Sequence, residues 1–127
     1  MREKTVIMAI YDKDNLFAKI LRGEIPCTKV YEDDYALAFH DINPQAPTHV
    51  LVIPKGEYVS WIDFSANAPA DLIAGFIRAV GATAKELGLE KDGYRILANT
   101  GGDANQVVPH LHIHIFGGKN LGPMLAS

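Results

Sequence analysis

The sequence predicts one α+β domain with a mainly antiparallel sheet, a short N-terminal helix and one long helix. Three observations carry this prediction. Segments that read as strands outnumber those that read as helices, turn residues join most of these strands directly, and one long stretch keeps apolar residues at helical spacing. Directly joined strands form hairpins, and the long helix is left to cover one face of the sheet.

The length and composition of the chain fit a single domain. The chain has 127 residues, 48% of them hydrophobic and 21% charged, which is enough for one hydrophobic core and ordinary for a globular protein. We expect the domain core to span about 14–118, between an N-terminal extension over 1–13 and a C-terminal tail over 119–127.

The first predicted element after the extension is a short helix over 16–21. Its apolar residues recur at helical spacing, Asp12 or Asp14 is placed to cap its start, and Gly23 is placed to end it. The preceding residues 1–13 are expected to be extended, and an added edge strand is the plain interpretation of them.

A hairpin and a further strand follow the short helix. Residues 30–32 and 35–40 are predicted strands around a turn at 33–34, because aspartates favour turns. Two prolines exclude regular structure over 43–47, which is predicted as a shaped loop leading into a strand over 49–53.

The C-terminal half predicts the long helix and two more strands. An apolar stripe begins near Pro69 and ends at Gly88, with proline at the start and glycine at the end as helices prefer. Strands are predicted over 94–98 and from about 106 to 116, separated by a glycine-containing loop over 100–105.

Charge and cysteine content exclude several classes of function. The net charge is -3 and the basic residues are spread along the chain, so no surface for nucleic acid or for a membrane is indicated. The apolar run over 5–11 is too short for a signal peptide or a membrane span. The single cysteine, Cys27, cannot form an internal disulfide and indicates a structural thiol in a reducing cytoplasm.

Three of the five histidines lie in one alternating segment between Pro109 and Gly117. The segment reads His110, Leu111, His112, Ile113, His114, Ile115 and Phe116. Alternation is the period of a half-buried strand, so the three imidazoles are predicted to share one face while the aliphatic residues enter a core. At a rise of roughly 3.3 Å per residue, neighbouring histidines stand about 6 to 7 Å apart and can act around one ligand atom.

Three interpretations of this histidine row remain open from the residues alone. The histidines can be an incidental polar face, a zinc site with an open position, or a nucleophile with neighbours that orient it and manage charge. His49, which follows the proline-containing loop, can relay a proton or complete a metal site. Asp103 is the nearest acid in sequence, and the lack of further carboxylates near the row favours the nucleophile over the metal.

The row and the segments around it resemble the histidine triad (HIT) family, whose signature is three histidines at alternate positions flanked by apolar residues. At the C-terminal end the resemblance rests on Pro109–Ile115, preceded by Asn99, Gly101, Asp103 and Gln106. Upstream it extends in the same order over Leu16–Ile20, Gly23–Pro26, Glu32–Asp34, Ala38–His49 and Leu51–Lys55. It covers about Leu16 to Gly118 and is nearest to the Hint branch of the family.

The resemblance implies a homodimeric, purine nucleotide-binding hydrolase of nucleoside phosphoramidates and aminoacyl adenylates, with a sheet that continues across the dimer. His112 is then the expected nucleophile, which attacks the α-phosphorus and forms a nucleotidyl-imidazole intermediate. His114 is expected to contact the phosphoryl oxygens and the leaving group. His110 and His49 are expected to fix the tautomer of His112 and share its proton.

The resemblance also implies a nucleotide-binding set. Asp41 is expected to accept hydrogen bonds from both ribose hydroxyls, and Gln106 with the backbone of the 101–107 loop is expected to hold phosphate oxygens, supported by Asn99. The expected apolar slot for the purine is formed by Phe17, Ile20, Phe39, His40 and Ile42. The implied ligands are purine nucleoside monophosphates and phosphoramidates.

The chain departs from the Hint pattern at three places, whereas His114 follows it. Val107 stands where a hydroxyl residue often helps hold the phosphate, which leaves its backbone N–H available for that contact, and Asn105 stands where glycine is common. The tail over 119–127 lacks the tryptophan of some relatives, which bears on leaving-group preference. His114, where the nucleotidyltransferase branch has glutamine, argues against that branch.

Other functions stay open beside the phosphoramidate hydrolase. A dinucleoside polyphosphate hydrolase would use the same His112 chemistry on a phosphoanhydride. A nucleotide-binding regulatory module with vestigial catalysis would use its dimer surface instead. A zinc hydrolase is the third alternative, although we expect no cofactor to be required and any zinc to be non-catalytic.

Overall fold

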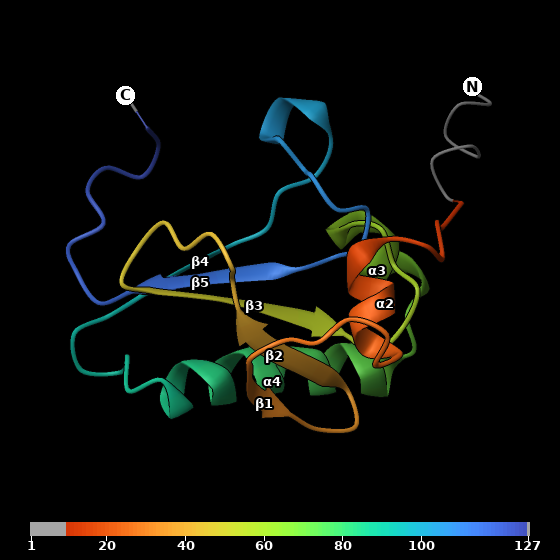
Figure 1. Ribbon diagram of the computed structural model, residues 1–127, viewed down its shortest axis with the longest axis horizontal. Coiled ribbons are helices and arrows are strands. Elements are labelled where there is room, and N and C mark those ends of the chain that lie inside the picture. The colour runs from red at the N-terminus through yellow and green to blue at the C-terminus, as the bar shows by residue number, and fades with distance from the viewer. Residues whose placement is uncertain (1–9, 127) are drawn as a thin grey trace.

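The computed structural model describes residues 10–126 and contains one five-stranded sheet with the order β1-β2-β3-β5-β4 (Figure 1). All four neighbouring pairs of strands are antiparallel, which confirms the predicted α+β class. The strands are β1 (Lys29–Glu32), β2 (Ala36–His40), β3 (Thr48–Pro54), β4 (Arg95–Leu97) and β5 (Ile113–Gly117). The helices are α2 (Leu16–Leu21), α3 (Trp61–Asn67) and α4 (Ala70–Glu86), with a short 3-10 turn η1 (Gly102–Ala104).

The N-terminal extension predicted over 1–13 falls largely outside the described residues, which begin at Ile10. Within 10–126, no helix has the length and the apolar character that a bilayer crossing requires.

The short helix α2 forms where it was predicted, but Asn15 caps it instead of Asp12 or Asp14. The Asn15 side chain accepts a hydrogen bond from the Ala18 N–H at 2.9 Å, since Asn15 directly precedes the first helical residue. Gly23 follows the helix with a φ of 78°, a left-handed conformation that glycine adopts at no steric cost.

The predicted turn between β1 and β2 is confirmed, and one carboxylate holds it. Asp33 accepts hydrogen bonds from the backbone N–H groups of Tyr35 and Ala36 at 2.8 and 2.9 Å. This aspartate closes the turn on its own backbone, which is the reason that aspartate favours such positions.

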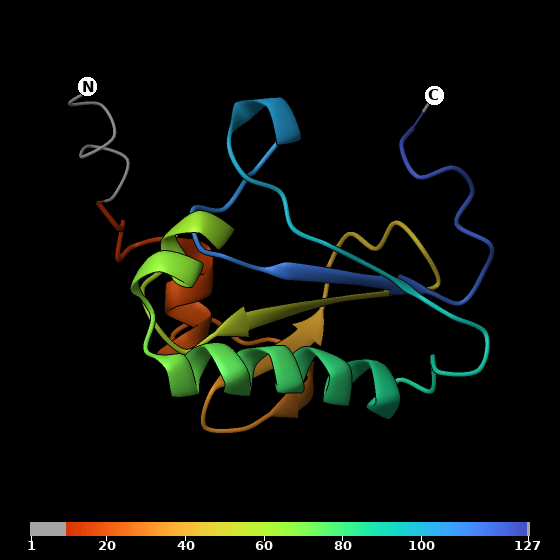
Figure 2. The same cartoon turned by 180° about the vertical axis from the view of Figure 1, so that it is seen from behind.

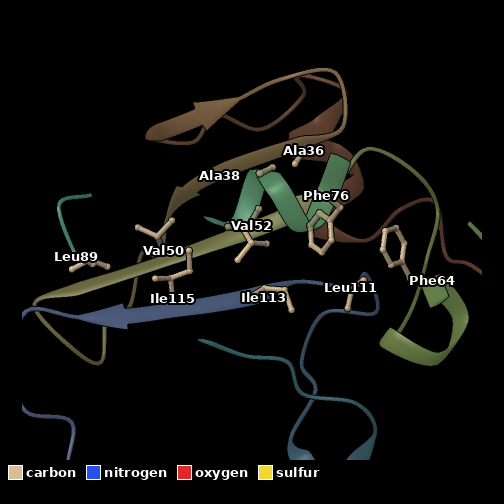
Figure 3. Packing of buried hydrophobic residues seen from close by; sticks show 12 residues of the cluster. Ala36, Ala38, Val50, Val52, Phe64, Phe76, Leu89, Leu111, Ile113 and Ile115 are labelled. Carbon is tan, nitrogen blue, oxygen red and sulfur yellow. The ribbon is translucent and has the colours of Figure 1, made fainter. Parts of the chain in front are cut away.

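Residues on alternate positions of the central strands enter two separate cores, one on each face of the sheet. Helix α4 covers one face and packs Phe76, Ala79 and Val80 against Val50 and Ile115 (Figure 3). On the other face, Phe17 of α2 packs with four residues of β2 and β3, and Cys27 is partly buried beside them. These four residues are Leu37, Phe39, Leu51 and Ile53.

The helix α3 was not predicted from the sequence, where the same segment gives little helical periodicity. Its start is capped by Ser60, whose hydroxyl accepts a hydrogen bond from the Asp63 N–H at 3.1 Å, while the Asp63 carboxylate accepts one from the Val59 N–H. Phe64 is the one residue of α3 that is fully buried, and Ile62 is 75% exposed, so the helix carries no apolar stripe.

The strand that carries the histidines is shorter than predicted. β5 begins at Ile113 rather than near 106, so His110 and His112 lie in an extended lead-in before the paired strand. In this lead-in the Leu111 N–H donates to the carbonyl of Tyr58, in the loop before α3, at 2.7 Å and not to a neighbouring strand. The alternation itself is confirmed, since the three aliphatic residues between and after the histidines are all buried in the α4 core.

The arrangement places the histidine row at the end of the sheet where two helices meet. Figures 1 and 2 show α2 and α3 next to each other, at the end where β5 begins, while α4 runs beneath the sheet. The histidines therefore emerge on the α2 face, with the aliphatic residues of the same segment fixed on the α4 face.

Candidate active site

His112 is the member of the row whose protonation geometry the structure defines best. Its Nδ1 lies 2.7 Å from the backbone carbonyl oxygen of His110, and the side chain is buried, 6% exposed. A carbonyl oxygen can only accept, so Nδ1 carries the hydrogen and donates it. In the neutral ring the Nε2 atom therefore keeps its lone pair, as a nucleophile or a metal ligand requires.

The two histidines beside it form a second chain of hydrogen bonds. The Gln45 N–H donates to His49 Nδ1 at 3.1 Å, so a neutral His49 carries its hydrogen on Nε2. That Nε2 lies 2.9 Å from Nδ1 of His114, which therefore accepts, and the hydrogen of His114 is left on its own Nε2. The rings of His112 and His114 lie with their centroids 5.0 Å apart, so an N–H donor stands next to a lone pair.

His110 contributes its backbone carbonyl to the site, while its imidazole forms hydrogen bonds with residues outside the histidine row. The ring is fully buried, with Nδ1 2.5 Å from the Tyr11 hydroxyl and Nε2 3.3 Å from the Pro54 carbonyl oxygen. His110 therefore contacts His112, as expected of a residue that fixes its tautomer, but through its backbone carbonyl rather than its imidazole. His49, expected to do the same, contacts His114 instead.

Aromatic rings enclose the histidines on two sides. Phe17 of α2 meets His112 edge to face, with ring centroids 4.9 Å apart. Phe116 lies parallel to His114 and its centroid is 4.2 Å from that of His49. Phe116 was not singled out from the sequence, although it occupies the next alternate position after His114 and so belongs to the same face of β5.

Burial keeps these histidines neutral near pH 7. It lowers the pKa of His110 to about 4, and burial together with the neighbouring His112 and His49 lowers the pKa of His114 to about 4. Burial also lowers the pKa of His112, against an opposing effect of its hydrogen bond to the His110 carbonyl. The pKa of His49 is lowered by burial and partly restored by the Asp41 carboxylate.

Asp41 lies beside the two linked histidines. Its Oδ2 is 3.4 Å from His49 Nε2, and its Oδ1 accepts a hydrogen bond from the Asn43 N–H at 2.8 Å. The side chain is 19% exposed, so the carboxylate is within reach of a ligand while it faces the histidine pair. The predicted contact of Asp41 with ribose hydroxyls remains a prediction.

Asp41, His49 and His114 also bring three potential metal ligands together, within 4.8 Å of one another. The hydrogen-bond pattern opposes a cation there. The Gln45 N–H occupies Nδ1 of His49, which places the hydrogen on Nε2, the atom that a metal ion would need. A metal could bind only after His49 exchanged tautomers and lost its bond to Gln45, so the donor set fits a proton chain better than a metal centre.

The residues predicted for the purine slot divide into two groups. Phe17 and Phe39 are buried with their ring centroids 5.6 Å apart, and Ile20 packs against the same cluster. His40 is exposed and Ile42 is 88% exposed, beyond the end of β2. The structure therefore supplies an apolar wall next to His112 and an open flank near Asp41.

The predicted phosphate-holding loop is tied back to the protein by Gln106. Its Oε1 accepts from the Gly101 N–H at 3.1 Å, and its Nε2 donates to the carbonyls of Val59 and Val108 at 2.8 and 3.1 Å. All of these partners are backbone groups, so the contact with phosphate that the sequence predicts would require one of these bonds to be exchanged. Val107, predicted to offer only its backbone, has a side chain 86% exposed.

Asn105 and Asn99 complete the loop. Asn105 adopts a φ of 58°, the left-handed conformation, which asparagine tolerates better than other non-glycine residues. Asparagine is therefore compatible with the backbone that this position requires. Asn99 is partly buried in the segment that follows β4, at the other end of the same loop.

A comparison with protein families matches residues 22–121 to the HIT domain. The chain belongs to the HIT family. The matched range includes all four histidines of the site, whereas the HIT match does not reach Tyr11 or Phe17.

Relatives of this HIT chain cover nearly its whole length. A HIT-like protein of Azospirillum brasilense is 66% identical over 117 residues, which are 92% of this chain and 96% of the relative. The purine nucleoside phosphoramidase of Escherichia coli is 44% identical over 114 residues, 90% of this chain and 95% of the enzyme. Among solved structures, a HIT family hydrolase from Clostridium thermocellum superposes with a TM-score of 0.81 at 38% identity, covering 91% of this chain and 99% of that one.

Proposed function

We propose that this HIT protein is a hydrolase that cleaves the P–N bond of purine nucleoside 5′-phosphoramidates through a nucleotidyl-His112 intermediate. The observation that carries the proposal is the hydrogen bond from His112 Nδ1 to the His110 carbonyl, which leaves a neutral Nε2 free to attack phosphorus. The identity of 44% to a purine nucleoside phosphoramidase supports the same substrate class. Aminoacyl adenylates are included, because their α-phosphorus presents the same target, but there the P–O bond to the acyl group breaks and a carboxylate leaves instead of an amine.

In the first step the Nε2 lone pair of His112 bonds to the α-phosphorus while the P–N bond breaks. The departing nitrogen needs one proton to leave as an amine, and His114 holds an N–H on the ring next to the nucleophile. The bound phosphoryl anion raises the pKa of His114, which lies at about 4 in the free site, so the His49–His114 pair takes up one proton from solution. His49 Nδ1 becomes an N–H in this step, and its hydrogen bond from the Gln45 N–H is given up. The Asp41 carboxylate offsets the positive charge of that pair.

In the second step water resolves the intermediate. The water oxygen bonds to phosphorus and gives one proton to His114, while the bond between phosphorus and His112 Nε2 breaks. His112 returns to its neutral form, because Nδ1 keeps its hydrogen and donates it to the His110 carbonyl throughout. The products are a nucleoside monophosphate and an amine.

The nucleotide is proposed to bind across the two groups of predicted residues. Asp41 accepts hydrogen bonds from the ribose hydroxyls and the apolar wall formed by Phe17, Ile20 and Phe39 takes the purine, with His40 and Ile42 at its open flank. Asn99 and the loop that carries Gln106 and Val107 face the phosphate. Stacking and burial on such a wall supply affinity with little selectivity between bases.

The test is a substrate comparison with a trap for the intermediate. Adenosine 5′-phosphoramidate and a diadenosine polyphosphate are offered separately, and we expect strong turnover of the first only. Mass spectrometry of protein quenched with a slow phosphoramidate is expected to show a nucleotidyl adduct on His112, absent from His112→Ala. A protein that binds nucleoside monophosphate but forms no adduct and hydrolyses neither substrate would be a binding module.

We further propose that no metal is needed for this reaction. The Gln45 N–H holds His49 in the tautomer that opposes a cation, and the proposed steps use only imidazoles. Turnover is expected to be the same before and after treatment with a chelator, with metal content measured on the same samples. Loss of activity on chelation and its return with zinc would instead make the protein a zinc hydrolase.

The protein is proposed to form a homodimer whose sheet continues across β4. This strand is the last in the order β1-β2-β3-β5-β4, and Ile96 in its centre is 50% exposed. An edge strand with an apolar side chain offers unpaired backbone groups to a second copy. A cytoplasmic location remains the prediction drawn from the lone Cys27.

A further inference from the structure

Tyr11 reaches from the N-terminal segment to the buried imidazole of His110, 99 residues later in the chain. Its hydroxyl lies 2.5 Å from His110 Nδ1, and the two rings meet edge to face with centroids 5.6 Å apart. Tyr11 lies outside the range matched to the HIT domain, in the segment 1–13, for which the sequence predicts no function.

The direction of this hydrogen bond follows from the other edge of the ring. His110 Nε2 lies 3.3 Å from the carbonyl oxygen of Pro54, which can only accept, so Nε2 carries the hydrogen. Nδ1 then holds a lone pair and the Tyr11 hydroxyl donates to it. Both edges of the His110 ring are therefore fixed, one by the strand β3 and one by the N-terminal segment.

The fixed ring belongs to the residue whose carbonyl sets the tautomer of His112. The His110 carbonyl accepts the Nδ1 hydrogen of His112 at 2.7 Å. That carbonyl belongs to the peptide unit whose N–H, on Leu111, donates to the Tyr58 carbonyl at 2.7 Å. The His110 side chain, held on both edges, restricts the other end of the same peptide unit, at the His110 Cα. The Tyr11 hydroxyl is thus linked to the proposed nucleophile, His112, through a single intervening residue, His110.

We propose that Tyr11 is a positioning residue for the reaction: by donating to His110 Nδ1 it holds the His110 carbonyl in line with Nδ1 of His112, and so keeps Nε2 of His112 aimed at phosphorus. The inference rests on the proposed function, because it takes His112 as the nucleophile. It assigns to the N-terminal segment a direct part in organising the site.

The charges around the contact are consistent with this direction. Burial raises the pKa of the Tyr11 hydroxyl, which therefore keeps its hydrogen at neutral pH and stays a donor. Burial lowers the pKa of His110 to about 4, so its Nδ1 stays free to accept over the whole neutral range. Neither group changes protonation state under the conditions of the test below.

The decisive variant is Tyr11→Phe, which removes the hydroxyl and keeps the ring that packs on His110. Its matched control is Tyr31→Phe, which removes a hydroxyl that donates to Asp33 at 2.9 Å in the β1–β2 hairpin. Loss of one neutral hydrogen bond in the supporting structure is expected to lower the single-turnover rate of nucleotidyl transfer about 3- to 10-fold. The Kd for a nucleoside monophosphate is expected to stay unchanged in both variants.

A second readout follows the imidazoles without any turnover. Nitrogen-15 NMR of the histidine side chains is expected to show His110 with its hydrogen on Nε2 and a hydrogen-bonded Nδ1. In Tyr11→Phe the Nδ1 resonance of His110 is expected to move towards that of a free lone pair, and Tyr31→Phe is expected to leave it in place.

The two readouts separate the failure of this inference from the failure of the proposed function. Wild-type protein that hydrolyses no phosphoramidate overturns the proposed function, and with it the catalytic role of Tyr11. An unchanged transfer rate in Tyr11→Phe, an equal loss of rate in Tyr31→Phe, or a His110 resonance that does not respond overturns the positioning role alone.

Discussion

At the scale of single residues, the alternation of histidines predicted which side chains share a face but not how each is protonated. The partners that fix the tautomers are backbone groups, namely the Gln45 N–H for His49 and the carbonyls of Pro54 and His110 for the row. No pattern of residue types reveals such partners. The predicted roles of Gln106 and Asp41 remain predictions, and the structure shows both already engaged by backbone groups.

Buried neutral histidines make stability depend on pH. An unfolded histidine titrates near 6.5, whereas the pKa of folded His110 lies at about 4 because of burial. As pH falls from 6.5 towards 4 the unfolded state binds the proton first, so the free energy of unfolding falls, and His110 alone accounts for about 2 kcal/mol between pH 7 and pH 5. Urea unfolding at both pH values measures this loss.

The control for this measurement is a pair of histidine variants. His110→Asn is expected to lower stability at pH 7 but to show a smaller loss between pH 7 and pH 5 than wild type. His40→Asn, at an exposed position, is expected to keep the wild-type loss. An identical pH dependence in wild type and His110→Asn would show that the buried ring is not the source.

At the scale of elements, a helix was predicted from the sequence where several of its residues are buried and was missed where few are. The helix α4 was predicted because apolar residues recur at helical spacing along it, and Phe76, Val80 and Ala84 of that stripe are buried, whereas α3, with only Phe64 fully buried, left no periodic signal. The strand β5 was predicted too long, since alternation marks an extended, half-buried backbone whether or not a neighbouring strand pairs with it.

Two glycines within α4 distinguish packing from helix propensity. A Cβ on Gly75 would lie 2.2 Å from the base of the Tyr35 ring, which cannot swing away, whereas a Cβ on Gly81 meets open space. Gly75→Ala is expected to lower the free energy of unfolding by about 1 to 3 kcal/mol through overpacking. Gly81→Ala is expected to raise it by about 0.5 to 1 kcal/mol, because alanine favours helix.

Thermal or urea unfolding of both variants beside wild type measures the difference. Equal effects at the two positions would show that α4 can shift away from the β1–β2 hairpin without cost, and would contradict the close packing of Gly75 against Tyr35.

At the scale of the whole molecule, one mainly antiparallel sheet with the long helix on one face was predictable, because local signals agreed with the global pattern along most of the chain. The way in which two copies of the chain associate was not predictable from the residues, since nothing in a strand of three residues tells whether a second copy covers its free edge. β4 spans only Arg95–Leu97, yet it ends the sheet on the side of the histidine-bearing strand.

The proposed dimer gives a prediction at this scale. Sedimentation of the wild-type protein is expected to give a dimer, and Ile96→Lys is expected to give a monomer, because a charge would be buried where β4 meets its copy. Ile62→Lys, a matched change at an exposed isoleucine of α3, is expected to leave the dimer intact. A monomeric wild type, or a dimer unaffected by Ile96→Lys, would exclude this edge as the interface.

The neutrality of the four imidazoles of the site has a consequence for how a nucleotide arrives. The residues described, 10–126, place no preformed cation in the site, and the net charge of the chain is -3, so long-range attraction is not expected to guide an anion inward and association is expected to depend weakly on ionic strength. In the proposed mechanism the bound phosphoryl anion instead induces protonation of the His49–His114 pair, and the resulting positive charge holds the anion. Because the buffer supplies that proton, calorimetric heats of nucleotide binding should vary with the ionisation enthalpy of the buffer.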